Sequence, residues 1–385
     1  MRYDLLIKGA TLVDPSRQLR ERQDVAFSAG RVAVSGVDLP EGEAGRTVNA
    51  AGLVITPGLV DLHTHVYWGA SHLSVDHRSI WAKSGTTTMV DAGSAGAQNF
   101  AAFRRFIMEH SQCRLLAFLH ISALGLTGVG LVGESTQIRY CNVADAVRTV
   151  KEHSDVIVGI KVRAEQDAVG QNGLAPLDLA LAAAEHVNLP VMVHIGHGPP
   201  ALADVLSRLR TGDILTHCYT DLGDTILDSK GCVRAFVWSA RQRGVWFDCG
   251  HGSRRFSYAV ARAALAQGFS PDSISTDLNS LDIGHPVHDL PTTMSKLLNL
   301  GMSLEDVISC TTATPALMIG WGGRLGSLQL GSDGDLSAFE VQEGEFPLYD
   351  ACGEALIGRR RLAPKFTVRS GQLVEFDDPD VRRRP

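Results

Sequence analysis

Histidine, lysine and aspartate residues stand near the ends of several short apolar runs in this sequence. The first run, LVDLHTH, ends in His63 and His65, which are separated by one residue. Alternate side chains of a strand point to the same side, so these two imidazoles can bind one metal ion. Later runs add one residue each: Lys161, His194, His217 and Asp277. Imidazole and carboxylate groups suit zinc, so this set predicts a metal centre, with manganese or iron as alternatives.

Each of these six residues also has a structural alternative. A single histidine at a strand end is more often a hydrogen-bonded core residue than a metal ligand. Lys161 could extend its ammonium group to solvent, and Asp277 could cap a helix in the turn STDLN. Six independent structural roles at the same ends of neighbouring strands would be a large coincidence, so we favour one shared site.

The elements that would position these residues are eight short apolar runs. They cover residues 59–65, 86–94, 114–122, 156–163, 190–197, 213–220, 245–252 and 273–279. Successive runs are roughly 25 to 40 residues apart, the length of one βα unit, and helical patterns lie between them. Buried strands that alternate with helices predict an α/β fold, a parallel (β/α)8 TIM barrel. The active sites of such barrels lie at the C-terminal ends of the strands, where the candidate ligands stand.

Both ends of the chain differ from the barrel segment. Residues 1–56 alternate apolar and polar side chains between turns, and residues 323–385 return to this turn-rich pattern. We therefore predict a small β-sandwich domain formed from both chain termini, and a barrel over residues 57–322. The final segment, DDPDVRRRP, is polar and is expected to fray.

Composition excludes several classes of protein. With 44% hydrophobic residues in a chain of 385, the sequence can bury a large core, which excludes disorder as the main state. A net charge of −6 does not favour a nucleic-acid partner. The start, MRYDLLIKGA, has no secretory signal pattern, and no apolar window is long enough to predict a membrane partner. Seven scattered cysteines without a C-x-x-C pair indicate reduced thiols and a cytoplasmic protein.

One glycine-rich stretch imitates a nucleotide-binding motif. Residues Gly128–Gly133 match G-x-G-x-x-G. A dinucleotide site needs a strand, a tight turn and a helix start in direct succession, and no clear helix begins here. We interpret the stretch as a flexible loop over the active site.

The segments TPGLVDLHTH, GIKVR, VMVHIGH, LTHC and STD resemble the amidohydrolase superfamily in its binuclear form, and the resemblance covers the whole chain. It implies that His63, His65 and Asp277 hold the more buried of two divalent metal ions. His194 and His217 would hold the more exposed ion. Lys161 would bridge both ions after its neutral amine has reacted with carbon dioxide to form a carbamate, an anion. Zinc is the expected metal.

Hydrolysis at a carbonyl group follows from such a centre. Two adjacent divalent ions would turn a bridging water into a hydroxide nucleophile, and Asp277 would carry its proton to the leaving group. A mononuclear deaminase would have a glutamate just after the histidine of the fifth strand. Here His194 is followed by IGHGPP, which argues against deamination.

The subfamily is indicated by longer stretches. VDLHTHVYWG and DLPTTMSKLLNLGMSLEDVI are similar to a group of bacterial metallohydrolases often labelled dihydroorotase. The resemblance implies a deacetylase that cleaves the acetyl ester of small α-hydroxy carboxylates. Dihydroorotase should show H-x-H-x-R, and Tyr67 replaces that arginine here. A cyclic amidase, dihydroorotase- or hydantoinase-like, is the alternative, and a non-catalytic metal-binding scaffold is a third hypothesis. A homo-oligomer is common for this resemblance.

An anionic small-molecule substrate needs a cationic partner. Arg163 lies two residues after Lys161, on the same strand face, and a guanidinium group can bind a carboxylate through two hydrogen bonds. A salt bridge at the barrel rim is an equal alternative for Arg163. Weaker candidates for the pocket lining lie on or near the strand-end loops: Tyr67, Tyr219, His251 and His288.

Overall fold

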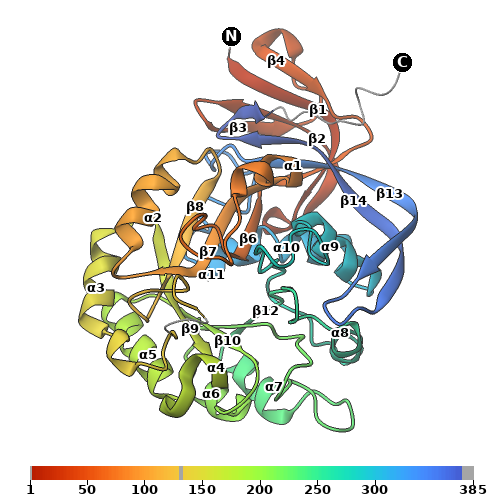
Figure 1. Ribbon diagram of the computed structural model, residues 1–385. Helices are drawn as coiled ribbons and strands as arrows, with labels where there is room; N and C mark the ends of the chain where they lie inside the picture. Colours follow the sequence, from red (N-terminus) through yellow and green to blue (C-terminus); the bar gives the residue numbers. More distant parts are fainter. Residues whose placement is uncertain (1, 130–132, 375–385) are drawn as a thin grey trace.

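Two groups of strands make up the protein. The computed structural model describes residues 2–129 and 133–374. Seven parallel strands with helices around them form one group, and strands from both ends of the chain, red and blue in Figure 1, form the other. The arrangement is a TIM-barrel-like α/β fold.

The seven-stranded sheet confirms seven of the eight predicted runs. Its strands are β6 (Leu59–Thr64), β7 (Thr86–Gly96), β8 (Arg114–His120), β9 (Ile157–Ala164), β10 (Val191–Ile195), β11 (Ile214–Thr216) and β12 (Trp246–Asp248). They lie side by side in chain order and all pairs are parallel. Their carboxyl ends therefore meet at one edge, where the candidate ligands stand.

The predicted eighth strand, residues 273–279, is not a regular strand. It is joined to its neighbours by single parallel bridges, Asp248 to Ser273 and Thr64 to Leu278. Two features interrupt the ladder: the backbone N–H of Thr276 donates to the Asp61 side chain, and Asp277 has a φ of +50°. A positive φ is incompatible with extended backbone, so the regular ladder is interrupted at this residue.

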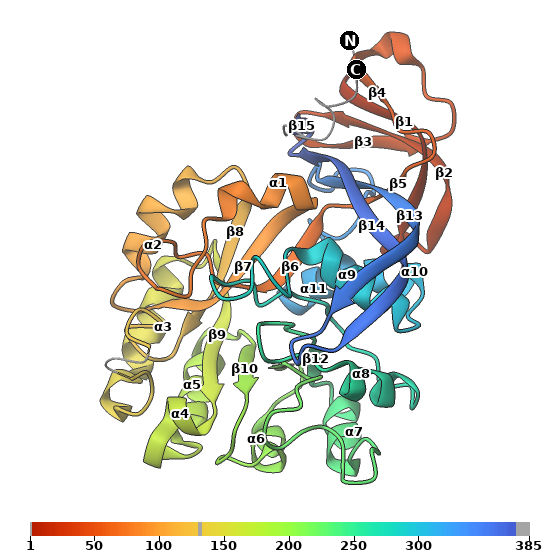
Figure 2. The ribbon, with the colours of Figure 1, turned by 45° about the vertical axis from the view of Figure 1, so that its right-hand side comes forward.

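Helices lie around this sheet, and some of them also pack against the strands of the chain ends. They are α1 (Trp81–Ser84), α2 (Phe100–Phe106), α3 (Val143–Glu152), α4 (Gln166–Val169), α5 (Ala175–Val187), α6 (Leu202–Arg208), α7 (Ala235–Gln242), α8 (Tyr258–Leu265), α9 (Leu290–Asn299), α10 (Leu304–Ser309) and α11 (Ala313–Met318). Figure 2 shows α2, α3 and α5 outside β7, β8 and β9. Side chains of Asn142, Asp289 and Ser303 cap α3, α9 and α10 by accepting a backbone N–H three residues on.

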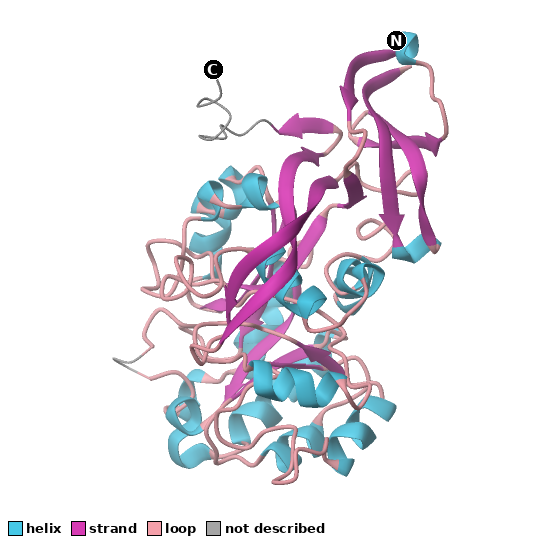
Figure 3. Ribbon diagram, turned by 90° about the vertical axis from the view of Figure 1, so that its right-hand side faces the viewer, coloured by secondary structure: helices cyan, strands magenta, loops and turns pink. Residues whose placement is uncertain are grey.

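The chain ends form one mixed sheet of eight strands. These are β1 (Tyr3–Asp14), β2 (Leu19–Ser28), β3 (Arg31–Gly36), β4 (Ala44–Asn49), β5 (Val54–Pro57), β13 (Leu336–Tyr349), β14 (Ala355–Arg369) and β15 (Gln372–Val374). The sequence predicts a small β-sandwich, and in the structure these strands share one hydrogen-bonded network. The reason is β1, which pairs with β4 before an irregularity at Gly9 and with β5 after it. The long β13–β14 hairpin runs along α9 (Figure 2). Figure 3 shows this hairpin as long magenta strands on the side that faces the viewer.

Several of the parallel strands carry buried apolar side chains before their carboxyl ends and polar side chains at their carboxyl ends. Phe118, Met192 and Ile214 pack in one buried cluster. Two residues further along the same strand faces stand His120, His194 and Thr216. One face of each strand thus contributes first to the core and then to the site.

Two predictions from the sequence concern residues outside the described part. The stretch Gly128–Gly133 includes residues 130–132, and the polar tail falls within residues 375–385. Both the flexible-loop interpretation and the fraying of the tail stay predictions. Within residues 2–129 and 133–374, no helix has the length and hydropathy needed to cross a bilayer.

Candidate active site

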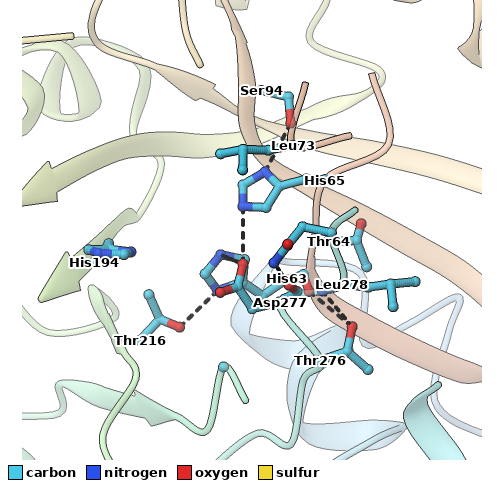
Figure 4. Close-up of polar contacts among 12 residues, drawn as sticks. His63, Thr64, His65, Leu73, Ser94, His194, Thr216, Thr276, Asp277 and Leu278 are labelled. Carbon is cyan, nitrogen blue, oxygen red and sulfur yellow. Dashed lines mark hydrogen bonds and ion pairs between the residues drawn. The ribbon is translucent and has the colours of Figure 1, made fainter. Parts of the chain in front are cut away.

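The structure brings all six predicted metal ligands together at the carboxyl edge of the sheet. His63 Nε2 lies 3.2 Å from Asp277 Oδ1 and 3.1 Å from Lys161 Nζ. His65 Nε2 lies 3.1 Å from the same Asp277 oxygen (Figure 4). His194 Nδ1 lies 2.8 Å from His217 Nε2, and the rings of His63 and His217 are 5.1 Å apart. Donor atoms of His63, His217 and Asp277 all lie within 4.8 Å of one another.

Two of these histidines point lone pairs at each other. His194 Nε2 lies 3.0 Å from Glu165 Oε1, and His217 Nδ1 lies 2.6 Å from the carbonyl oxygen of Gly250. Both outer nitrogens face acceptors and must carry the protons of the neutral rings. The inner nitrogens, His194 Nδ1 and His217 Nε2, are then both acceptors at 2.8 Å. This pair lacks a hydrogen atom, and a shared cation is the partner that fits it.

His63 also has one ring nitrogen that donates a hydrogen bond and one that faces another acceptor. The Thr216 hydroxyl donates to Asp248 Oδ2 at 2.6 Å, so its oxygen accepts the proton of His63 Nδ1 at 2.9 Å. His63 Nε2 therefore presents a lone pair to Asp277 Oδ1, which is itself an acceptor. His65 Nδ1 is held by Ser94 Oγ at 2.9 Å, which leaves its Nε2 towards Asp277 (Figure 4).

Burial keeps the imidazoles in the neutral, metal-binding form. It lowers the pKa of His63 to about 4 and of His194 to about 3, and it holds the pKa of His217 well below its usual value. At pH 7 no proton has to leave these three rings before they bind a metal ion.

Lys161 is buried in β9 with its amine at the centre of the site. Besides His63 Nε2, its Nζ contacts Met192 Sδ at 3.4 Å. Burial lowers the pKa of Lys161 to about 7, which makes the neutral amine accessible. Gly93 leaves room for the lysine stem, because a Cβ at this position, where φ is +87°, would lie 2.7 Å from Lys161 Cγ.

The sequence prediction missed Glu165, which connects His194, a candidate metal ligand, to the arginines of the cavity wall. Its Oε1 accepts from His194 and from Arg163, and its Oε2 accepts from Arg255 Nη2 at 2.9 Å. Burial alone would raise the pKa of Glu165, but the imidazole and the two guanidinium groups outweigh it and lower the pKa. The signal for Glu165 is its spacing, since Lys161, Arg163 and Glu165 alternate along one strand face.

We expect Glu165→Gln to weaken metal binding by about tenfold, because an amide is a poorer acceptor for the His194 N–H than a carboxylate. A chelator competition titration of zinc measures the effect, and thermal unfolding of the metal-free variant checks its fold. Glu134→Gln is the matched control, since Glu134 contacts Arg163 and His120 but none of the six ligands. Equal zinc affinity of Glu165→Gln and the parent protein would contradict the role.

Arg163 takes the salt-bridge role that the sequence prediction weighed as its alternative. Its Nη1 donates to Glu134 Oε1 at 2.6 Å and its Nη2 donates to Glu165. Both terminal nitrogens are thus engaged by buried carboxylates. This arrangement favours the salt-bridge alternative, and binding of the substrate carboxylate by Arg163 stays a prediction.

A cavity of about 180 Å³ adjoins the centre. Its wall includes His65, Lys161, His194 and Asp277, together with Arg163, Arg254 and Arg255. Among the described wall residues, Asp277 is the only carboxylate. The volume is below the range of about 300–1,000 Å³ typical of sites for drug-sized ligands, so the cavity fits a small molecule.

The two tyrosines predicted as weaker pocket residues lie outside the described cavity wall. The Tyr67 hydroxyl donates to the carbonyl oxygen of Asn99 at 3.2 Å. Tyr219 is fully buried and its hydroxyl donates to the carbonyl oxygen of Phe269 at 2.9 Å. Both phenol groups are used in packing, so neither is assigned to the substrate.

His251 and His288, the other two weaker candidates, also lie outside the described cavity wall. His251 is buried and its Nε2 lies 2.9 Å from Lys296 Nζ. His288 is exposed, on the loop before α9. Neither lines the described cavity wall.

Comparison with known proteins identifies the family. The amidohydrolase family model matches residues 54–374. The chain belongs to the amidohydrolase family. A deacetylase of Agrobacterium fabrum is 36% identical to this amidohydrolase over 350 residues, which cover 90% of the chain and 84% of that relative. A deacetylase of Enterococcus faecalis is 32% identical over 380 residues, or 97% and 100% of the two chains. The protein is therefore a hydrolytic enzyme, and its family is in general metal-dependent.

Solved structures support the same placement. An adenine deaminase structure matches this amidohydrolase with a TM-score of 0.91 at 31% identity, covering 97% of this chain and 100% of the other. A dihydroorotase structure matches with a TM-score of 0.89 at 34% identity, covering 96% and 97%. An L-hydantoinase from Arthrobacter aurescens, at 15% identity and a TM-score of 0.67 over 97% and 96%, shares the fold.

Proposed function

We propose that this amidohydrolase is a deacetylase that hydrolyses the acetyl ester of small α-hydroxy carboxylates. The observation that carries the hydrolytic part is the set of imidazole and carboxylate acceptors that face one another without a hydrogen atom between them. The deacetylase relatives, which match this chain over most of its length, support the acetyl group. The small cavity beside the ligands supports a small substrate.

The residues fit a pair of divalent metal ions, and zinc suits their donor types. We assign His63, His65 and Asp277 to one ion and His194 and His217 to the other. Lys161, as a carbamate, would supply an anionic oxygen to each. A lysine that is buried at the centre of the ligands, with a neutral amine accessible near pH 7, supports this modification. Bound divalent ions lower the pKa of a water molecule and polarise a carbonyl oxygen.

Asp277 moves the proton in this proposal. Its Oδ1 is shared by His63 and His65, and it is the only carboxylate in the described cavity wall. It accepts the proton of the attacking water and returns it to the leaving alkoxide oxygen. A positive φ places Asp277 at the cavity, and Gly252 leaves room for it, because a Cβ there would lie 2.5 Å from Asp277 Oδ2.

A cyclic amidase is the second candidate, because a dihydroorotase structure is among the similar ones. In that proposal the same residues would open a cyclic amide. Tyr67 argues against a dihydroorotase, because it stands where that enzyme should have an arginine. Its side chain is neutral, donates a hydrogen bond to the carbonyl oxygen of Asn99 and lies outside the described cavity wall. Deamination is less favoured, since Ile195 and Gly196 follow His194.

A substrate panel tests the proposal. Zinc-loaded protein is assayed with acetylated α-hydroxy acids, N-acetyl amino acids, dihydroorotate and hydantoins. We expect kcat/KM for the acetyl esters to exceed that for the other classes by at least about tenfold, or about 1.4 kcal/mol in the transition state. Faster turnover of dihydroorotate or a hydantoin would establish the cyclic amidase instead.

Carbamate formation on Lys161 should depend on pH in a defined way. Only the neutral amine reacts with carbon dioxide, and the pKa of Lys161 is lowered to about 7. At fixed dissolved carbon dioxide, the rate of carbamate formation should therefore rise about tenfold per pH unit below pH 7 and level off above about pH 8. The carbamate signal of protein incubated with ¹³C-labelled carbon dioxide and zinc measures this rate. A rate that still rises at pH 9 would indicate an ordinary lysine.

The closure of the barrel and the division into domains are also proposals. We propose that residues 273–279 close the barrel as its eighth strand, and that residues 57–322 form the barrel domain. Residues 1–56 and 323–385 would form the small β-sandwich domain. The pairing of β5 with β13 across the two chain ends supports this division. A homo-oligomer and a cytoplasmic location stay predictions from the sequence.

A further inference from the structure

We propose that Arg255 is the residue that binds the carboxylate of the substrate and so determines its class. The inference rests on the proposed hydrolysis of a small acetylated carboxylate. Arg255 lies in the segment after β12 and lines the cavity together with His65, His194 and Asp277.

Arg255 has a free hydrogen-bond donor. Its Nη2 donates to Glu165 Oε2 at 2.9 Å, but its Nη1 is buried and has no hydrogen-bond partner among the described residues. A buried hydrogen-bond donor without an acceptor destabilises the folded protein, and the effect is larger when the group is charged. A carboxylate in the cavity would supply the missing acceptor, and hydrogen bonds between ionised groups are the stronger ones.

The other two arginines of the cavity wall fit this role less well. Arg163 already donates from both terminal nitrogens to Glu134 and Glu165. Arg254 is exposed and no side chain holds it in place among the described residues, so binding would have to immobilise it. Among the described arginines of the wall, Arg255 is held in position and keeps a buried terminal nitrogen unpaired, whereas Arg163 leaves only its Nε without a partner.

The position of Arg255 also indicates that the substrate carboxylate would lie close to the reacting carbonyl. Glu165 accepts from the metal ligand His194 through Oε1 and from Arg255 through Oε2. A single carboxylate group therefore separates the proposed anchor from the proposed metal centre. Gly196 permits this close approach, because a Cβ there would lie 2.6 Å from Arg255 Nη1. This short spacing favours an acid whose acetylated oxygen is on the α-carbon over one with a longer chain.

The test compares a charged and a neutral substrate of nearly equal shape. O-acetyl-lactate and O-acetyl-lactamide are assayed with the zinc-loaded parent protein, Arg255→Gln and Arg255→Lys, with Arg254→Gln as the matched control. The parent should prefer the acid. We expect Arg255→Gln to reduce the ratio of kcat/KM for the acid over the amide by about 10- to 100-fold. Arg255→Lys should retain part of the preference, and Arg254→Gln should change the ratio by less than about threefold.

Other outcomes would overturn the proposal. If Arg255 only supports Glu165, the variants should lose activity on both substrates equally, with the ratio unchanged. A loss of the preference in Arg254→Gln alone would assign the anchor to Arg254. If the parent hydrolyses neither ester, the proposed function fails. Titration calorimetry with lactate and lactamide then tests carboxylate binding by Arg255 separately, since Arg255→Gln should weaken only the binding of lactate.

Discussion

Lys161→Ala is expected to lose zinc and to reduce kcat/KM by about a thousandfold or more. The variant removes the group proposed to supply an oxygen to each metal ion, and metal-assisted polarisation and water activation are worth several kcal/mol. Lys161 is buried against His63 and Met192, so no exposed lysine can take its place. Zinc content by atomic absorption and turnover of an acetylated α-hydroxy acid measure the two effects.

Chemical rescue separates the bridging role from a packing role. Formate, acetate or propionate added with zinc to Lys161→Ala should restore part of the activity, because a free carboxylate can replace the carbamate in the space of the deleted side chain. Lys296→Ala is the matched control. Lys296 is also fully buried, and burial lowers its pKa to about 7, but it bonds to His251 and the carbonyl oxygen of Pro286. This control should keep its zinc, and full activity of Lys161→Ala would refute the bridging role.

Asp277→Asn should lower kcat by about 10²- to 10⁴-fold, the range attributed to general acid–base groups. Asparagine has nearly the same shape as aspartate but cannot accept and return the proton of the attacking water. Zinc content should fall less than kcat, because His63 and His65 still contact the site. Single-turnover kinetics with zinc content measured in the same sample distinguish loss of proton transfer from loss of metal.

Asp282→Asn, the same substitution five residues further along the chain, is the control for Asp277→Asn. Asp282 is buried, and burial raises its pKa to about 9. It accepts hydrogen bonds from Asn279 and from no metal-ligand candidate. Asp282→Asn should change kcat by less than about tenfold. An equal loss in both variants would mean that the segment, not the proton shuttle, accounts for the effect.

The regular part of the fold could be predicted from the sequence because its signals are local. Seven apolar runs became strands in the predicted order, since valine and isoleucine favour strands that are buried on both faces. The eighth run failed as a regular strand because Asp61, more than two hundred residues away, captures the N–H of Thr276. No local pattern around residue 276 contains that information.

Candidate substrate-binding residues are harder to recognise in the sequence than candidate metal ligands for a related reason. The spacing of His63 and His65 on one strand, and the repetition of ligand types at strand ends, are properties of the chain itself. Whether an arginine is free depends on which carboxylates reach it through space. Arg163 has the expected strand position, but Glu134 and Glu165 occupy its terminal nitrogens, while Arg255 has one nitrogen left over.

The sequence by itself therefore determined the α/β class, the order of the parallel strands and the six residues that meet at their ends. Periodicity and residue type are sufficient for these features, because a strand fixes which side chains share a face. Only the tertiary structure decided which ring nitrogen of each histidine faces the centre and which arginine of the described cavity wall keeps a buried terminal nitrogen unpaired. Those properties follow from hydrogen bonds between distant segments, such as His194 with Glu165 and His63 with Thr216, and they exist only once the chain has folded.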